Sequence, residues 1–205
     1  MIGVLNIGIG NIRSVLNAVV ETGFEAEVVD SHAALGALSH FIIPGVGQFA
    51  TAMRNLRDKG LRDAIVDFAG SGRPVLGICL GMHILADLGA EGGESNGLGL
   101  IPGCVDRLLV NNNLRLPHVG WNTVTKTRDH PILGGLKPDR DFYFVHSHGF
   151  ACEDPNDIMA VTDYGEEFPC IVGRDNVVGF QFHPEKSQVN GLQLIETFCG
   201  WDGAC

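Results

Sequence analysis

The run RPVLGI at residues 73–78 constrains the fold more than any other segment of this 205-residue chain. It is short, and its nearly unbroken apolar character predicts a strand that is buried on both faces. Such a strand is typical of the centre of a parallel sheet with helices on both sides. The run therefore predicts an α/β protein.

Strand-like and helix-like segments alternate through the first half of the chain. Three further strands are predicted at residues 2–7, 26–30 and 40–44. Apolar residues at helical spacing predict one helix between Asn11 and Thr22 and one long helix from about Met53 to Phe68. This succession predicts right-handed crossovers and a doubly wound, mostly parallel sheet with helices on both faces.

The second half adds short strands that turn-forming residues separate. They are predicted at residues 105–110, 114–124, 142–147, 157–162, 170–174 and 177–182, before a final helix at about 187–199. Most of the connections predict antiparallel pairing, with Asp175 and Asn176 as a hairpin turn. The length and the 45% hydrophobic content fit a single domain over residues 1–205.

Composition argues against several classes of function. The net charge is −10 and Lys and Arg are scattered, which argues against nucleic acid as a partner. No apolar run reaches the roughly 18 residues of a membrane span. The chain has no secretory signal pattern and its six cysteines form no CxxC pair, so we expect a cytoplasmic protein with reduced thiols. Phosphate-binding and metal-ligand spacings are absent, so we expect no cofactor and no metal.

Residues 77–81 (GICLG) follow the buried strand directly and carry the most specific motif in the chain. A strand that runs through G-x-C-x-G into a helix forms a nucleophile elbow. It would present the Cys79 thiol and leave the Leu80 N–H free to stabilise an oxyanion, while the helix predicted at residues 82–88 favours the thiolate. The alternative for the pentapeptide alone is a structural cysteine between two packing glycines.

Two other segments complete a candidate site at the ends of predicted strands. His183 follows residues 179–182, and Glu185 can orient its ring as the base of a cysteine nucleophile. In residues 44–47 (PGVG), glycines can turn peptide N–H groups outward as the second half of an oxyanion hole. Taken alone, the first segment also fits a polar loop that caps the last helix, and the second fits an ordinary strand-to-helix turn.

The motifs PGVG, GICLG and FHPE, in this order, resemble those of class I (triad-type) glutamine amidotransferases. Further segments, among them GIGNIRSV, LPHVGWN and FYFVHS, make the chain most similar to the glutaminase subunits of imidazole glycerol phosphate synthase. The resemblance covers nearly the whole length. It implies that Cys79, His183 and Glu185 form a catalytic triad that hydrolyses glutamine to glutamate and ammonia.

The resemblance also implies further site residues and a partner. The oxyanion hole would comprise Gly45, Val46 and Leu80, and the substrate contacts Gly47, His83, Ser147 and His148. The partner interface would comprise Asn11, Pro117, Trp121, Tyr143 and Lys186. The partner would be a (β/α)₈-barrel cyclase, which forms a heterodimer with this chain. It would use the ammonia to make imidazole glycerol phosphate and AICAR in histidine biosynthesis.

Two positions depart from the family pattern. His83 stands where the family usually has Gln, and His148 stands where it usually has Tyr. In a strand, His146 and His148 would face one way and Ser147 the other. Three alternatives stay open: a paralogue that supplies ammonia for amidine formation on a bacterial surface sugar, a self-sufficient cysteine hydrolase, and a catalytically impaired scaffold subunit.

Overall fold

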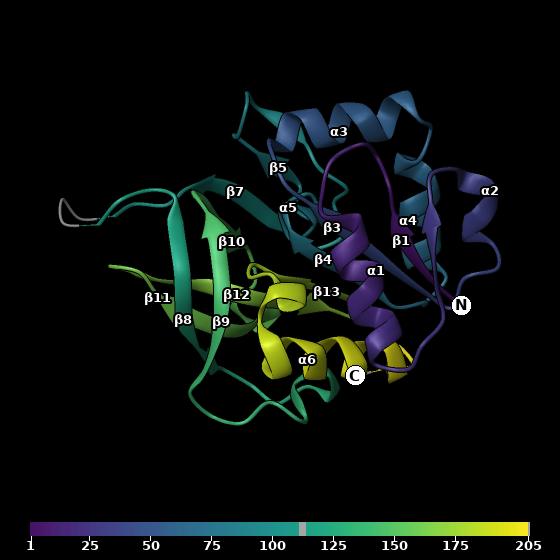
Figure 1. Ribbon diagram of the computed structural model, residues 1–205. Coiled ribbons are helices and arrows are strands. Elements are labelled where there is room, and N and C mark those ends of the chain that lie inside the picture. The colour runs from purple at the N-terminus through teal and green to yellow at the C-terminus, as the bar shows by residue number, and fades with distance from the viewer. Residues whose placement is uncertain (111–113, 205) are drawn as a thin grey trace.

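A nine-stranded sheet forms the centre of the computed structural model, which describes residues 1–110 and 114–204 (Figure 1). The strand order is β2-β1-β3-β4-β13-β12-β11-β8-β9. The strands are β1 (Ile2–Leu5), β2 (Ala26–Val29), β3 (His40–Gly45), β4 (Val75–Cys79), β8 (His118–Lys126), β9 (Arg140–His146), β11 (Ile158–Asp163), β12 (Glu167–Arg174) and β13 (Val177–Phe180). Pairing is parallel from β2 to β13 and antiparallel from β13 to β9, so the antiparallel addition is confirmed. The predicted hairpin turn at Asp175 and Asn176 joins β12 to β13.

Helices cover both faces of the parallel half, which confirms the doubly wound arrangement (Figure 1). One face carries α1 (Ile12–Glu21) and α6 (Gln188–Gly200), and the other carries α2 (His32–Leu35), α3 (Phe49–Asp58) and α4 (Arg62–Gly70). Alternate side chains of β3 enter two separate hydrophobic cores. Ile42 packs in the core with α1 and α6, whereas Phe41 and Ile43 pack in the core with α3 and α4.

The single long helix predicted between Met53 and Phe68 is wrong. α3 ends at Asp58 and α4 begins at Arg62. Gly60 lies between them with φ +64°, a left-handed conformation that glycine adopts at little cost and that a continuous helix does not contain. The apolar stripe continues across the break because both helices turn the same face to the core.

The helix predicted at residues 82–88, after the cysteine motif, is also wrong. The helix there, α5, is a single turn over Leu80–His83. The Leu98 N–H donates to the Ile84 carbonyl at 2.8 Å and so occupies an acceptor that a longer helix would need. A loop remote in sequence therefore ends the helix. A helix this short supplies much less dipole than the sequence implied.

A second, four-stranded sheet with the order β10-β7-β5-β6 completes the fold. Its strands are β5 (Leu88–Gly89), β6 (Ser95–Asn96), β7 (Gly103–Arg107) and β10 (His148–Cys152). The chain passes from the large sheet to this one at Ser147, between β9 and β10. The strand predicted at residues 142–147 therefore ends at His146. The prediction that His146 and His148 face one way along a single strand, with Ser147 facing the other way, is wrong.

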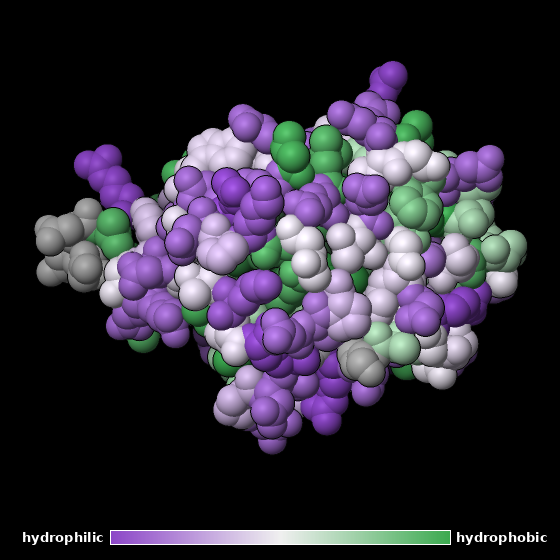
Figure 2. Space-filling model, turned by 90° about the horizontal axis from the view of Figure 1, so that it is seen from below, coloured by the Kyte–Doolittle hydropathy of each residue, from purple (hydrophilic) through white to green (hydrophobic). Residues whose placement is uncertain are grey.

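The face that carries α6 is mostly hydrophilic, with small scattered apolar areas (Figure 2). None of the helices within the described ranges is long and apolar enough to cross a membrane. The five cysteines in these ranges are free thiols, and Cys205 lies outside them.

Candidate active site

Cys79 occupies a strained turn where β4 ends. Its φ of +53° and ψ of −108° are rare for a residue with a side chain. A Cβ at Gly77 would lie 2.5 Å from the Gly81 carbonyl oxygen, and a Cβ at Gly81 would collide with the Ile43 carbonyl. Glycine is therefore required on both sides, and the motif forms the predicted elbow, in which Cys79 is only 6% exposed.

His183 and Glu185 form a buried pair beyond the end of β13. His183 Nδ1 lies 2.8 Å from Glu185 Oε1, and the two side chains are 3% and 1% exposed. The turn η3 (Pro184–Lys186) carries Glu185 behind the ring. Ser187 Oγ donates to the His183 carbonyl and accepts the Tyr143 N–H, but it makes no side-chain cap on α6. The segment is therefore more than the helix-capping loop that it resembles when read alone.

The second ring nitrogen of His183 faces the thiol side of the site. This Nε2 is buried and has no hydrogen-bond partner among the described residues. Burial by itself would lower the pKa of His183, but the Cys79 thiol and the Glu185 carboxylate together raise that pKa to about 9. The imidazolium form is therefore stabilised between two groups that carry negative charge when ionised. This arrangement suits a thiolate nucleophile with a proton donor beside it.

The predicted oxyanion segments converge on the thiol. Gly45 lies opposite Cys79 in the parallel register of β3 and β4. Val46 and Leu80 line one pocket together with Cys79. Backbone N–H groups from two strand ends can thus approach a single reacting atom.

A pocket of about 320 Å³ opens over Cys79. It is lined by Val46, Gly47, Gln48, Cys79, Leu80, His83, Glu91, Pro117, Val145, His146, Ser147 and His148. All four predicted substrate contacts are among these residues. Gly47 has φ +111° and carries no side chain into the pocket. A space of this size, with a few polar groups on its wall, suits one small ligand.

Glu91 is a pocket residue that the sequence did not reveal. Its Oε1 lies 3.3 Å from His148 Nδ1, but that nitrogen makes no hydrogen bond within the described ranges, so the contact is electrostatic. Burial raises the pKa of Glu91, and the nearby His148 opposes that rise. In the sequence, Glu91 appears only as an acidic residue at the start of a glycine-rich loop that follows an apolar segment. This pattern is too common to identify Glu91 as a binding residue.

His83 faces the pocket as a neutral ring. Its Nε2 lies 2.8 Å from Gln181 Oε1, and both residues are buried. Burial lowers the pKa of His83 to about 4, although the Gln181 contact opposes this shift. His83 therefore adds a polar group to the pocket without adding a charge at neutral pH.

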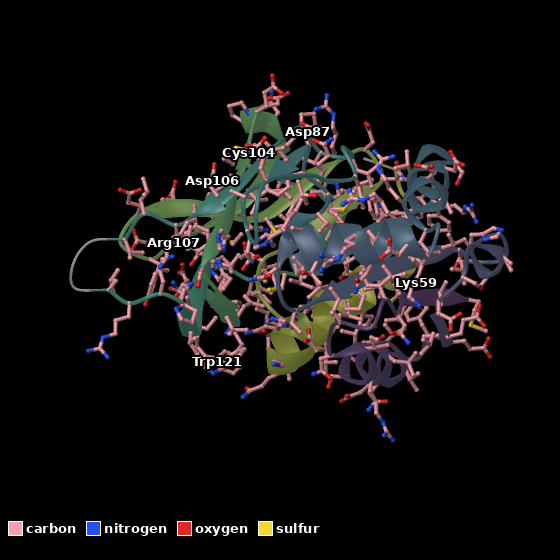
Figure 3. All side chains as sticks on the ribbon, turned by 90° about the horizontal axis from the view of Figure 1, so that it is seen from above. Lys59, Asp87, Cys104, Asp106, Arg107 and Trp121 are labelled. Atoms are coloured by element: carbon pink, nitrogen blue, oxygen red, sulfur yellow. The ribbon has the colours of Figure 1, made fainter. Side chains whose placement is uncertain are left out.

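Three of the predicted interface residues form a surface cluster. Lys186 Nζ lies 5.7 Å from the centre of the Tyr143 ring, and the Trp121 ring lies 6.0 Å from it. Trp121 is 47% exposed and stands at the edge of the molecule (Figure 3). Asn11 is exposed just before α1, which contacts η3, whereas Pro117 lines the pocket.

The sequence matches the glutamine amidotransferase class-I family over residues 3–199. "Imidazole glycerol phosphate synthase subunit HisH" of Desulfitobacterium hafniense is 47% identical over 98% of this chain and 94% of that protein. The protein of the same name from Symbiobacterium thermophilum is 47% identical over 94% of this chain and 90% of its own length. "Imidazole glycerol phosphate synthase subunit HisH 2" of Nitrobacter winogradskyi is 42% identical over 98% of both chains.

Solved structures share the architecture. A structure described as a glutamine amidotransferase has a TM-score of 0.75 at 24% identity and covers 97% of this chain and 98% of its own. PurLQS from Thermotoga maritima has a TM-score of 0.75 at 20% identity, with 97% and 96% covered. At these identities the likeness shows the fold alone. From the family match and the similarity to the HisH proteins, we conclude that this chain belongs to the class-I glutamine amidotransferases.

Proposed function

We propose that this chain is the glutaminase subunit of a cytoplasmic imidazole glycerol phosphate synthase. The observation that carries the proposal is the Cys79 elbow beside the buried His183–Glu185 pair, at the wall of a pocket for a small ligand. The similarity to HisH proteins over nearly the whole chain supports the assignment to histidine biosynthesis rather than to surface-sugar amidation. The ordered His183–Glu185 pair argues against a catalytically impaired scaffold.

The first chemical step forms a thioester. The Cys79 thiolate attacks the side-chain amide carbon of glutamine and gives a tetrahedral intermediate with a negatively charged oxygen. N–H groups from the Gly45–Val46 peptide region and from Leu80 stabilise this oxygen. The intermediate then collapses as the carbon–nitrogen bond breaks.

His183 supplies the proton that the leaving group needs. Its imidazolium, whose pKa is raised to about 9, donates from Nε2 to the departing nitrogen and so releases ammonia. The neutral ring next takes a proton from water, which attacks the thioester and releases glutamate and the Cys79 thiolate. Glu185 holds the Nδ1–H throughout and keeps Nε2 directed at the reaction.

The far wall of the pocket binds the amino-acid end of glutamine. The Glu91 carboxylate has the charge that an α-ammonium group requires, and the corner at Ser147 and His148 offers peptide groups to the α-carboxylate. Gly47 leaves room for the substrate beside the oxyanion segment. His83 contributes a neutral polar contact in place of the amide that the family usually has.

Ammonia passes to a (β/α)₈-barrel cyclase, which binds as the second subunit of a heterodimer. The cluster of Trp121, Tyr143 and Lys186 belongs to the docking face, together with Pro117 and Asn11. Val46 is 42% exposed and continues directly from the Gly45 segment. Engagement of the partner next to Val46 can therefore alter the orientation of the oxyanion peptide, so the glutaminase should be fully active only in the complex.

A glutaminase assay with and without the cyclase subunit tests this function. The isolated chain should release glutamate slowly, and the complex with the cyclase and its nucleotide ligand should release it at least about 100-fold faster, the contribution of one oxyanion donor. A glutamine-like alkylator should label Cys79 in that complex. Full activity without a partner would favour a self-sufficient hydrolase, and a complex without glutamate release or labelling would refute the proposal.

A further inference from the structure

Two buried histidines, one in the pocket wall and one behind it, have no part in the chemistry described above. His118 in β8 is 3% exposed and His146 in β9 is 6% exposed. His118 Nδ1 lies 3.0 Å from His146 Nε2, across the antiparallel register in which the two residues are paired. Two rings in direct hydrogen-bond contact restrict each other's proton position, because one nitrogen must donate and the other accept.

The His146 ring also reaches over the point where the chain changes sheets. Its Nδ1 donates to the His148 carbonyl at 2.7 Å, so the ring spans Ser147. Ser147 and His148 both line the pocket, and the Ser147 carbonyl is held by the Leu108 N–H at 3.0 Å. The His146 ring therefore fixes one side of the corner that would contact the substrate's α-groups.

The His148 carbonyl can only accept a hydrogen bond, and it therefore determines which nitrogen carries the proton in both the His146 and the His118 ring. His146 must carry its proton on Nδ1 to donate to the His148 oxygen, so a neutral ring has its lone pair on Nε2. His118 must then donate from Nδ1. Burial lowers the pKa of His118 to about 4 and that of His146 to about 3, which keeps both rings neutral at pH 7.

Aromatic neighbours hold the His118 ring in its plane. The ring stacks on Tyr164 at 4.0 Å and on Phe144 at 4.9 Å, with interplanar angles of 21° and 20°. The residues on either side of His118 are Pro117, which lines the pocket, and Val119, which is 55% exposed. β8 thus has an outer face that is open to a partner and an inner histidine that bonds to the His146 ring, which in turn bonds to the pocket corner at His148.

We propose that His118 and His146 are a positioning dyad, which holds the Ser147–His148 corner for glutamine and links that corner to the exposed face of β8. This inference rests on the proposed function. His146 lines the pocket, but within the described residues neither ring of the dyad hydrogen-bonds to Cys79, His183 or Glu185. The dyad acts through the His148 carbonyl, and its effect should therefore fall on the KM for glutamine more than on kcat.

Two variants at one position separate the hydrogen bond from the packing. His118→Phe keeps a flat ring between Tyr164 and Phe144 but removes the donor, whereas His118→Asn keeps an N–H near the place of Nδ1 and removes the ring. In the complex with the cyclase, we expect His118→Phe to raise the KM for glutamine about tenfold, which is the size of one buried hydrogen bond, with kcat within about twofold. His118→Asn should raise the KM by less than about threefold.

The reverse order of the two KM effects would contradict the proposed dyad. A larger KM change in His118→Asn than in His118→Phe, or no change in either, would mean that His118 serves only packing. His130→Phe is the matched control, because His130 is another buried histidine and packs against Trp201. It should lower the melting temperature and leave the KM unchanged.

Nuclear magnetic resonance tests the dyad without activity. At pH 7 the ring ¹⁵N shifts of the isolated wild-type chain should report Nδ1–H tautomers for both His118 and His146. His118→Phe should shift the backbone amide signals of Ser147 and His148, and His118→Asn should largely keep them. An Nε2–H tautomer on His146 would refute the dyad, even in a chain with normal glutaminase activity. A wild-type complex without glutaminase activity would instead refute the proposed function and leave this test valid.

Discussion

Gly45 lies directly opposite Cys79 in the register of β3 and β4, so the peptide that leads to Val46 begins beside the predicted nucleophile. The approach is close. A Cβ at Gly45 would lie 2.9 Å from Leu80 Cβ and 3.2 Å from the Gly81 nitrogen. Any side chain at Gly45 must therefore push apart the two strand ends that carry the proposed oxyanion donors.

Gly45→Ala should lower kcat for glutamine hydrolysis in the cyclase complex by about 100-fold, which is the usual cost of misplacing one oxyanion donor. Steady-state kinetics measure this directly. Gly36→Ala is the matched control, because its Cβ would meet no atom within 4 Å and its φ of −59° suits alanine. Equal losses in both variants, or none in Gly45→Ala, would argue against this role for the Gly45 segment.

Glu185→Gln should reduce kcat by at least about 100-fold, because the amide keeps the shape of the carboxylate but loses its charge. The pKa of His183, which is about 9 partly because of Glu185, should fall. The pH–rate profile of the complex should then lose activity at a lower alkaline pH than the wild-type profile does. Glu27→Gln on the exposed edge strand β2 is the control and should leave the profile in place.

The proximity of Cys79, His183 and Glu185, the proposed triad, could be predicted because each belongs to a short motif at the end of a strand. The Cys79 elbow needs only the flanking glycines and a buried strand, and both are local in sequence. His183 and Glu185 are two residues apart, and the turn between them brings them together. The signal for the central strands and for α1 and α6 was equally local, because apolar periodicity marks these elements, whereas the same periodicity merged α3 and α4 into one helix.

Features that depend on distant segments could not be predicted. The length of α5 is limited by the Leu98 N–H, which takes the Ile84 carbonyl. Glu91 reaches the pocket only because its loop packs across α3, where its carbonyl accepts the Ala50 N–H. No single segment of the sequence encodes such a contact, since it arises from the packing of two loops.

Stability should be greatest near neutral pH and decline on both sides. Burial lowers the pKa of His83 and His118 to about 4 and of His146 to about 3, below the 6.5 of an exposed histidine. The unfolded chain binds more protons in that window, so the free energy of unfolding falls as the pH drops from about 6.5 to 4. His183 has the opposite sign: its pKa is raised to about 9, so its contribution is complete below about 6.5 and is lost as the pH rises through 9.

Urea unfolding at pH 4.5, 7 and 9.5 measures the decline in the free energy of unfolding on the acidic side and on the alkaline side. We expect a loss of about 2 kcal/mol or more at pH 4.5, because His83, His118 and His146 take up protons as the chain unfolds at this pH. Glu185→Gln should reduce the loss of unfolding free energy between pH 7 and pH 9.5. It should leave the loss between pH 7 and pH 4.5 unchanged. A free energy of unfolding that changes in one direction across this range would contradict the assignment.

Lys186→Ala should weaken binding of the cyclase subunit about tenfold, because the ammonium lies over the Tyr143 ring at the proposed docking face. Titration calorimetry or gel filtration of the mixed subunits measures the affinity. Lys59→Ala is the matched control. Lys59 is an exposed lysine at the end of α3, well away from Trp121 (Figure 3). An equal effect of both variants would indicate only a loss of net charge.

Glu91→Gln should separate substrate binding from chemistry. The carboxylate lines the pocket beside His148 and lies outside the triad, so its loss removes a charge complementary to the α-ammonium of glutamine. We expect the KM for glutamine in the complex to rise about 10- to 100-fold, the range for a charged hydrogen bond, with kcat within about threefold. Glu94→Gln, an exposed carboxylate in the same loop, controls for loop structure and should leave the KM unchanged. A large fall in kcat with unchanged KM would instead place Glu91 in the reaction itself. Activity of Glu91→Gln on a glutamine analogue without the α-amino group should match the wild type, because neither enzyme then has an ammonium to bind.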